Sequence, residues 1–322
     1  MTYIFESGLA HHIEGLIQQK RADGYAYNSE EKQLKRFDTF CVQNYPELTT
    51  VTYEMAAKWS EDRPGEGDAY HNRCMSMVKV LSEYILSLGQ EAYIPNFFCK
   101  AYRPVLYIPS KEEVKELLQK MDIRTSHNSE QFRLDRECKI LFLLYFCCGL
   151  RLSEGRLLKW EHIDLDKGIL TVLGSKGNKD RLVYLPQDSL PVLKNYKERQ
   201  EMLFPGIDWA FPGKDPHKPV SCSGIESSFN RHWAMLPVAR TVDKHPTPHC
   251  LRHAFVVERF NEWMHQGIDT NTMLPYLSRY LGHKSPDETY YYYHLAGKAF
   301  DTIREKDSVS GKVIPEVIPY EE

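Results

Sequence analysis

The chain has 322 residues, of which 42% are hydrophobic and 26% are charged, and its formal net charge is −3. This length is sufficient for two domains with cores of their own, and the composition is typical of a globular protein. No run reaches the ~18 apolar residues of a membrane span, and the first residues lack the features of a signal peptide, so we expect a cytoplasmic protein with no membrane partner. The net charge does not favour a nucleic-acid partner, so a DNA-binding surface would require charges sorted onto one face.

The eight cysteines form no CxxC pair and have no regular spacing. This distribution indicates neither a disulfide framework nor a zinc ribbon. We expect reduced thiols, most of them buried.

Residues 1–92 show apolar residues at helical spacing and no strand pattern. The first helical pattern runs from Leu9 to Ile17, and three more follow, the last of them a long one through Leu86. The segment after Gly89 carries three prolines among aromatic residues, which is typical of an extended linker. We therefore predict a four-helix domain over residues 1–92 and a linker over residues 93–108.

A second, mainly helical domain is predicted over residues 109–306. It begins with a capping box, Ser110-Lys111-Glu112-Glu113, and continues with a buried apolar helix that ends at Gly149. Two short strands, Ile169 to Leu173 and Leu182 to Leu185, are expected to form a hairpin around the turn GSKGNKD, with a third strand possible near His162 to Leu165. Further helices are expected around residues 190–202, 225–235, 248–266, 272–281 and 286–304. The predicted fold is thus mainly α with a small antiparallel sheet.

Six residues with reactive or anion-binding side chains follow one another in this second domain. They are Arg151 in GLRLSE, Lys176 in GSKGNK, His249 and Arg252 in HCLRH, His283 in LGH, and a tyrosine nine positions later. In this order and context the chain resembles the tyrosine recombinase (phage integrase) family, including its bacterial Xer-type members. The resemblance covers residues 108–300, and the N-terminal helices are similar to the core-binding domain of that family.

The reaction that the resemblance implies explains these residue types. A tyrosine hydroxyl that attacks a DNA phosphodiester must lose its proton, although its pKa is near ~10. The pentavalent phosphate needs fixed positive donors, and two guanidiniums, Arg151 and Arg252, suit that task. The departing 5′ hydroxyl needs a proton, which a lysine on a hairpin tip, Lys176, is placed to give.

The resemblance also assigns roles to the histidines. It implies that His249 assists proton transfer, that His283 hydrogen-bonds the scissile phosphate, and that the acidic position held by Glu154 supports the site. The product is a 3′-phosphotyrosyl link, which allows strands to be exchanged and resealed without ATP. The reaction requires no metal and no cofactor.

Four tyrosines, residues 290–293, follow His283. Because successive helical residues diverge by about 100°, only one of them can point into the site. Family members place the nucleophile nine positions after the LGH histidine, in a Tyr-x-His context, and this rule selects Tyr292. Tyr291 and Tyr293 are the alternative candidates.

Each of these residues also has a purely structural interpretation. Arg151 follows a helix end and could bind carbonyl groups there, and Lys176 could be a solvated charge on a turn. His249 and His253 stand four residues apart and could bind a metal, but HCLRH lacks the intervening glutamate of a zinc protease helix, so His253 is expected to pack near the site. Gly155 occupies a position where leucine is frequent in the family.

We therefore predict a site-specific DNA recombinase that grips duplex DNA between its two domains and acts in a homotetrameric synapse. Accessory DNA-bending proteins or a partner recombinase are compatible with it. Residues 307–322 are expected either to dock on a neighbouring protomer or to form a frayed terminus. The alternative functions are a type IB topoisomerase, a catalytically silent DNA-binding regulator and, more distantly, a metal-dependent hydrolase.

Overall fold

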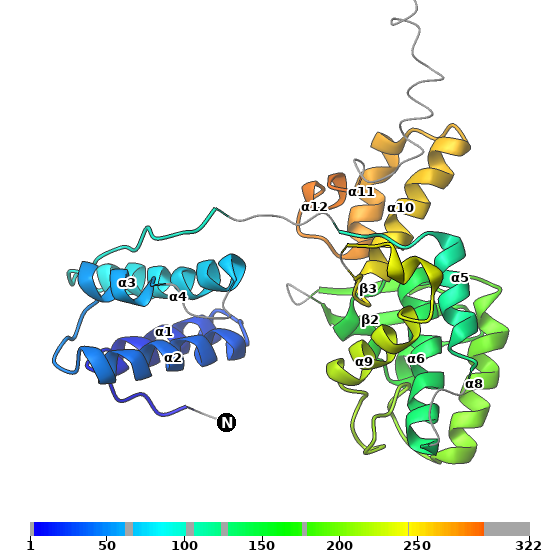
Figure 1. Ribbon diagram of the computed structural model, residues 1–322, viewed down its shortest axis with the longest axis horizontal. Coiled ribbons are helices and arrows are strands. Elements are labelled where there is room, and N and C mark those ends of the chain that lie inside the picture. Colours follow the sequence, from blue (N-terminus) through cyan, green and yellow to red (C-terminus); the bar gives the residue numbers. More distant parts are fainter. Residues whose placement is uncertain are drawn as a thin grey trace, which may run out of the picture. The chain divides into compact units, whose positions relative to one another are not determined.

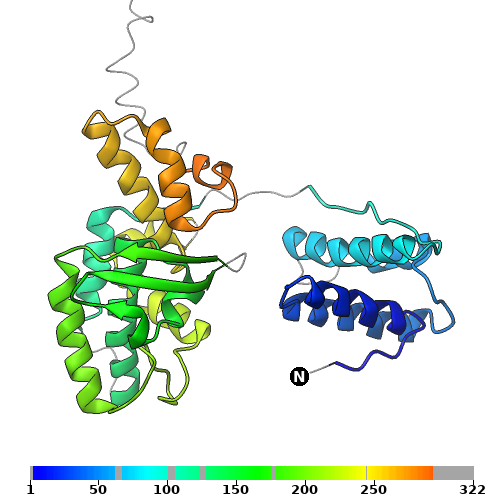
Figure 2. The ribbon, with the colours of Figure 1, turned by 180° about the vertical axis from the view of Figure 1, so that it is seen from behind.

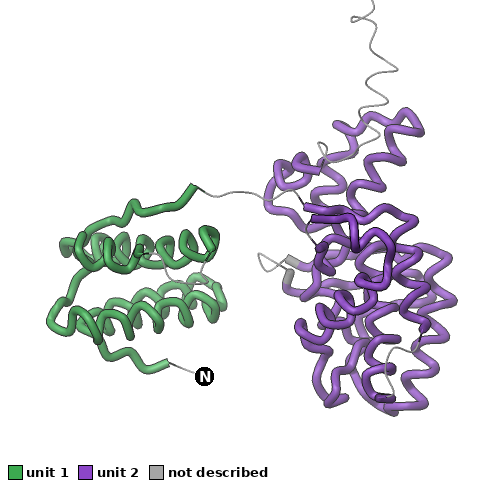
Figure 3. Tube along the Cα trace, in the orientation of Figure 1, with its two compact units in different colours: residues 1–105 green, residues 106–322 purple. Residues whose placement is uncertain are grey.

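The computed structural model of the chain describes residues 3–61, 67–100, 106–123, 128–175, 179–243 and 245–292. The chain divides into two compact units, residues 1–105 and residues 106–322 (Figure 3). Each unit has a hydrophobic core of its own. Among the described residues, no helix is both long enough and apolar enough to cross a membrane. All eight cysteines lie among the described residues and none of them forms a disulfide bond; five are buried.

Unit 1 is helical wherever regular structure is described. Its four helices are α1 (Ala10–Ala22), α2 (Asn28–Asn44), α3 (Tyr53–Trp59) and α4 (Asp68–Ser87). Their apolar faces meet in one core, in which Leu9, Leu34 and Met75 are completely buried. The predicted four helices of this part are therefore present.

The first part of the segment predicted as a linker packs on unit 1. The backbone N–H of Tyr93 donates to the carbonyl of Val51 (2.8 Å), and the rings of Tyr93 and Phe97 both contact the ring of Tyr53. These aromatic side chains remove apolar area from water, which stabilises the extended chain against the helices.

Unit 2 combines helices with a small sheet (Figures 1 and 2). Its helices are α5 (Lys111–Lys120), α6 (Ser129–Cys148), α7 (Leu152–Arg156), η1 (Trp160–His162), α8 (Ser189–Leu203), α9 (Cys222–Trp233), η2 (Pro237–Arg240), α10 (Cys250–His265), α11 (Thr270–Leu281) and α12 (Asp287–Tyr290). Its strands are β1 (Ile163–Asp164), β2 (Ile169–Ser175) and β3 (Lys179–Tyr184), in an antiparallel sheet of order β1-β2-β3. This architecture confirms the predicted fold class.

The predicted hairpin and capping box are present as well. Ile169 pairs with Tyr184 across β2 and β3, and the side chain of Ser110 accepts from the backbone of Glu113 while Glu113 accepts in return. The predicted last helix, residues 286–304, is described only up to residue 292, where α12 ends at Tyr290; residues 293–304 lie outside the described residues. The backbone N–H of Tyr292 bonds to Thr289 three residues back, so the chain turns more tightly than an α-helix there.

Helix α6 is the centre of unit 2, and the chain leaves it by a turn that glycine makes possible. Gly149 has φ of 63°, and a Cβ there would lie 2.5 Å from the ring of Phe255. A Cβ on Gly155, in α7, would lie 2.5 Å from Tyr145 of α6. The Tyr145 hydroxyl also donates to the carbonyl of Leu152 (2.9 Å). The glycine in place of the frequent leucine therefore lets α7 lie directly on α6.

Candidate active site

Two arginines from distant parts of unit 2 lie at the ends of helices α6 and α11. Arg252, in the first turn of α10, is 2% exposed and donates to the carbonyls of Gly149 (2.6 Å) and Leu281 (2.8 Å). Arg151, immediately before α7, donates to the carbonyl of Gly282 (2.6 Å). Binding to carbonyls at a helix end was the structural alternative for Arg151, and the same contacts bring both guanidiniums to one place.

A buried carboxylate holds these arginines together. Glu154 accepts from the backbone N–H of Arg151 (2.7 Å) and from its Nη1 (2.8 Å), and the Nη1 of Arg252 lies 3.9 Å away. Arg181 donates with both terminal nitrogens, at 2.8 and 2.7 Å, one to each oxygen. Burial raises the pKa of Glu154, but the hydrogen bonds from Arg181 and Arg151 outweigh it and lower the pKa to about 2. The cluster thus carries three guanidiniums against one carboxylate.

The sequence-based prediction did not include Arg181, although the sequence holds a signal for it. In β3, Arg181 stands two residues before Val183 and four residues before Leu185, and the side chains of both are buried. Side chains of alternate strand residues share a face, so an arginine on the buried face requires an acidic partner. Its Nε also donates to the carbonyl of Tyr280 (2.8 Å), which connects the sheet to α11.

His283 is oriented by hydrogen bonds on both ring nitrogens. It follows Gly282, which ends α11 with a φ of 66°. The Nη2 of Arg252 lies 3.0 Å from its Nε2, and the hydroxyl of Thr289 lies 2.7 Å from its Nδ1. Because a guanidinium can only donate, Nε2 accepts and Nδ1 carries the proton. Burial and then the charge of Arg252 lower the pKa of His283 to about 3, so the ring is neutral.

Tyr292 is buried beside these groups. Only 5% of it is exposed, its ring is parallel to that of His283 at a centroid distance of 6.5 Å, and its hydroxyl lies 2.6 Å from Nδ1 of His253. Burial lowers the pKa of His253 to about 3, so this imidazole is neutral and shares one hydrogen bond with the Tyr292 hydroxyl. Burial raises the pKa of Tyr292 to about 12, against the lowering effect of the Arg252 charge. The hydroxyl is protonated in this arrangement.

The neighbouring tyrosines have other surroundings. Tyr290 and Tyr291 are 45% and 39% exposed, and the hydroxyl of Tyr290 donates to Asn271 (3.0 Å). Tyr293 lies outside the described residues. Of the tyrosines of this run that the structure describes, Tyr292 is the one whose hydroxyl faces the histidines.

Two predicted site residues remain. His249 stands at the start of α10, with its ring centroid 4.7 Å from that of His253. Partial desolvation of the ring and the charges of Arg252 and Arg151 lower the pKa of His249 to about 4. Lys176, at the tip between β2 and β3, lies outside the described residues. Within the part of the chain that the structure describes, no third acidic, histidine or cysteine side chain joins His249 and His253 in a cluster suited to a metal ion.

The arrangement can bind and polarise an anion. Arg151, Arg252 and Arg181 are charged, their nitrogens are fixed by carbonyls and by Glu154, and the neutral histidines add further donors or acceptors. Fixed donors at a partly water-excluded site stabilise developing negative charge more strongly than water does. A buried tyrosine hydroxyl within the same cluster supplies a nucleophile.

Comparison with known sequences gives one family. The sequence model described as "Phage integrase family" matches residues 110–298. The chain is 28% identical to a Sinorhizobium fredii protein named integrase/recombinase y4rB, with 87% of this chain and 90% of the relative aligned. It is 27% identical to the tyrosine recombinase XerC of Alcanivorax borkumensis, over 87% of this chain and 86% of the relative.

Solved structures share the fold at low sequence identity. A XerH site-specific recombinase bound to its difH substrate, in a post-cleavage complex, aligns with a TM-score of 0.62 at 20% identity, over 87% of this chain and 79% of that one. The integrase of transposon Tn1549, in complex with circular-intermediate DNA, aligns with a TM-score of 0.62 at 16% identity, over 91% and 98%.

Proposed function

We propose that this chain, which belongs to the phage integrase family and is a tyrosine-type site-specific DNA recombinase, breaks and rejoins DNA through a 3′-phosphotyrosyl bond to Tyr292. The observation that carries the proposal is the position of the Tyr292 hydroxyl. It is buried against His253 and His283, and His283 is bonded to Arg252. A nucleophile, a proton acceptor and a cationic donor therefore stand within one cluster.

In the proposed reaction the phenolic oxygen of Tyr292 forms a bond to phosphorus, and the bond from phosphorus to the 5′ oxygen breaks. Arg151 and Arg252 hold the non-bridging oxygens, and His283 hydrogen-bonds the phosphate once its Nε2 is released from Arg252 and carries a proton. Lys176 gives a proton to the leaving oxygen. The proton that Tyr292 loses passes to His253, which is hydrogen-bonded to its hydroxyl, and His249 assists this transfer. The reverse reaction with a second 5′ hydroxyl reseals the strand, so the energy of the broken bond is kept.

The described arrangement is a resting one. A phenol with a pKa of about 12 is almost entirely protonated at neutral pH, and the pKa of His253 is about 3, so the proton stays on Tyr292. A DNA phosphate bound at Arg252 would compete with His283 for its Nη2 nitrogen. We infer that DNA binding changes the surroundings of the Tyr292 hydroxyl before cleavage.

The wider assembly is part of the same proposal. Unit 1 and unit 2 together grip a duplex recombination site, two protomers act on each duplex, and the synapse is a tetramer in the cytoplasm. Residues 307–322 would dock on a neighbouring protomer. A type IB topoisomerase would instead relax DNA as a monomer, so a supercoil-relaxation assay compared with a two-site recombination assay separates the two functions.

The proposal is tested with DNA that carries a nick close to the cleavage site, so that covalent intermediates accumulate. Tyr292→Phe is expected to bind this DNA and to form no covalent adduct, because it lacks the phenolic oxygen. Tyr290→Phe, which loses only a hydroxyl bonded to Asn271, serves as the matched control and should form adducts normally. Undiminished adduct formation by Tyr292→Phe would refute the assignment.

A further inference from the structure

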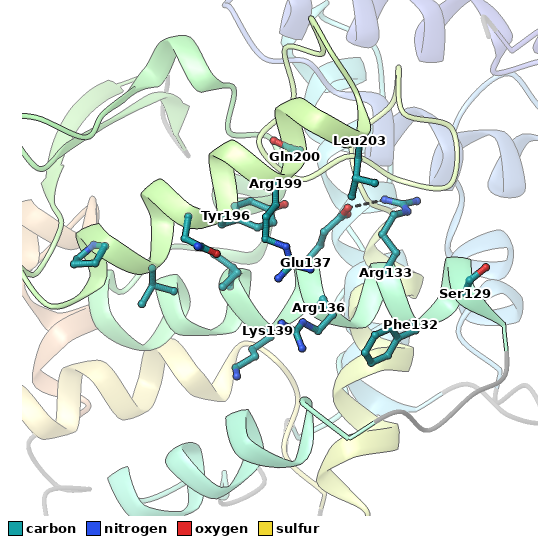
Figure 4. Close-up of a pocket in the computed structure, with 14 residues that line it drawn as sticks. Ser129, Phe132, Arg133, Arg136, Glu137, Lys139, Tyr196, Arg199, Gln200 and Leu203 are labelled. Carbon is teal, nitrogen blue, oxygen red and sulfur yellow. Dashed lines mark hydrogen bonds and ion pairs between the residues drawn. The ribbon is translucent and has the colours of Figure 1, made fainter.

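A long groove lies between helices α6 and α8 of unit 2 (Figure 4). Its volume is about 540 Å³, its α6 wall extends from Ser129 to Ile140, and its α8 wall extends from Pro191 to Leu203. At about 1.5 Å per residue these walls are roughly 16–18 Å long, or about three helical turns. None of the proposed catalytic residues that the structure describes lines this groove.

Apolar side chains form much of the groove. Phe132 and Ile140 contribute from α6, and Val192 and Leu203 contribute from α8. Val192 is 41% exposed and Leu203 is 60% exposed, and the adjacent Met202 is 81% exposed. Exposed apolar side chains along a groove are typical of an interaction site.

Positive charge surrounds the apolar walls. Arg136, Lys139 and Arg199 line the groove (Figure 4). Asp122 pairs with Lys139 (2.6 Å) and approaches Arg136 (3.5 Å), whereas no ion pair holds Arg199 within the described part of the chain. In a protein with a net charge of −3, these cations are a local excess.

The wall of the groove includes a carboxyl group, that of Glu137, with one oxygen that has no hydrogen-bond partner among the described residues. Glu137 is 4% exposed, and its Oε1 accepts from Nη1 of Arg133 (2.6 Å). Its Oε2 is buried and has no hydrogen-bond partner among the residues that the structure describes. Burial raises the pKa of Glu137 to about 7, against the pull of Arg133, so the carboxyl can also act as a donor.

We propose that the α6–α8 groove is the docking site for an acidic amphipathic helix of a partner protein. The apolar stripe of such a helix fits Ile140, Val192 and Leu203, and its carboxylates fit Arg136, Lys139 and Arg199. A helix laid in a groove buries about three turns, which matches the length of the walls. Duplex DNA would match the cations and leave the apolar walls exposed to water. The proposal does not depend on the reaction proposed for Tyr292.

The test uses the full chain and a designed peptide of about four helical turns, with leucine at positions i, i+3, i+4 and i+7 and glutamate at most other positions. A second peptide carries lysine in place of glutamate. We expect saturable binding of the acidic peptide and none of the basic one, measured by fluorescence anisotropy. Arg199→Glu and Leu203→Asp should each weaken binding by about tenfold or more, because both side chains face the groove.

Lys194→Glu is the matched control on α8. Lys194 pairs with Asp166 and does not line the groove, so this variant should bind the peptide like the original protein. All three variants are expected to cleave DNA at the original rate, because none touches the proposed catalytic residues. This result separates the docking site from the proposed function.

Several outcomes would overturn the proposal. One is a lack of saturable binding of the acidic peptide, and another is equal binding of that peptide by Arg199→Glu and the original protein. A third is loss of DNA affinity in Arg199→Glu, which would make the groove a nucleic-acid surface. A peptide of residues 307–322 that displaces the acidic peptide and binds more tightly would also overturn it, since the occupant would then be a segment of this chain.

Discussion

Two glutamates of unit 2, Glu154 and Glu137, have equally buried side chains, but their pKa values are shifted in opposite directions. Each side chain is 5% exposed, and each is bonded to an arginine three or four residues away in sequence. The pKa of Glu154 is lowered to about 2, whereas that of Glu137 is raised to about 7. Burial raises both pKa values, so the difference comes from the partners.

The partners differ in number and position. Both oxygens of Glu154 are occupied by Arg151 and Arg181, whereas one oxygen of Glu137 is bound by Arg133 and the other has no partner within the described residues. A carboxylate with several charged donors is stabilised in its ionised form. The hydrogen bonds of Glu154 are therefore complete and hold the arginines of the candidate active site together, whereas those of Glu137 are incomplete.

Replacing Glu154 should have the largest effect. In Glu154→Gln the side chain keeps its size but loses its charge, and three neighbouring guanidiniums lose their counter-ion. We expect DNA cleavage to slow by about 100-fold or more, and the folded state to lose roughly 3–5 kcal/mol. Glu137→Gln is the matched control, and its cleavage rate should stay within about threefold of the original. Equal cleavage rates for the two variants would remove the distinction between the sites.

Replacing Arg181 should have a smaller effect on the same cluster. Arg181→Lys keeps the charge but cannot donate to both oxygens of Glu154 at once. We expect cleavage to slow by about tenfold with little change in DNA affinity, because Arg181 positions Arg151 through Glu154. Arg231→Lys, which alters a similar contact with Asp135 outside the active site, should leave the cleavage rate unchanged. A fall in DNA affinity alone would contradict a positioning role.

The two glutamates should give opposite, smaller dependences of stability on pH. Glu154 stabilises the folded state above its ordinary pKa of 4.5, and this contribution is lost as the pH falls from 4.5 to about 2. Glu137 binds its proton more tightly when folded, so its contribution is lost as the pH rises from 4.5 to about 7.

Urea unfolding of both glutamine variants across this pH range measures the two contributions. The deficit of Glu154→Gln relative to the original protein should shrink toward acid. Glu137→Gln should gain stability relative to the original protein as the pH rises. Parallel pH profiles for the two variants would show that the sites are equivalent.

Short-range patterns in the sequence were sufficient to predict many of the helices and strands of this molecule. The capping box at Ser110, the helix end at Gly149 and the β2–β3 hairpin depend on neighbouring residues, and all three were predicted. The spacing of nine residues from His283 selected Tyr292, whose hydroxyl does face the histidines. Its role as the nucleophile stays a prediction.

Contacts between distant segments were harder to predict. Arg181 meets Glu154 across 27 positions of sequence, and only the alternation of β3 hints that its side chain is buried. Glu137 has no pattern in the sequence that predicts its burial.

The identity of the residue that carries the DNA tests the central claim most directly. After reaction of the original protein with nicked DNA, nuclease and trypsin should release a peptide of residues 285–298, because lysines stand at positions 284 and 298. This peptide contains all four tyrosines, so its fragmentation by mass spectrometry can locate the attached nucleotide. We predict that the nucleotide is on Tyr292. A nucleotide on Tyr290, Tyr291 or Tyr293 would contradict the assignment of the nucleophile.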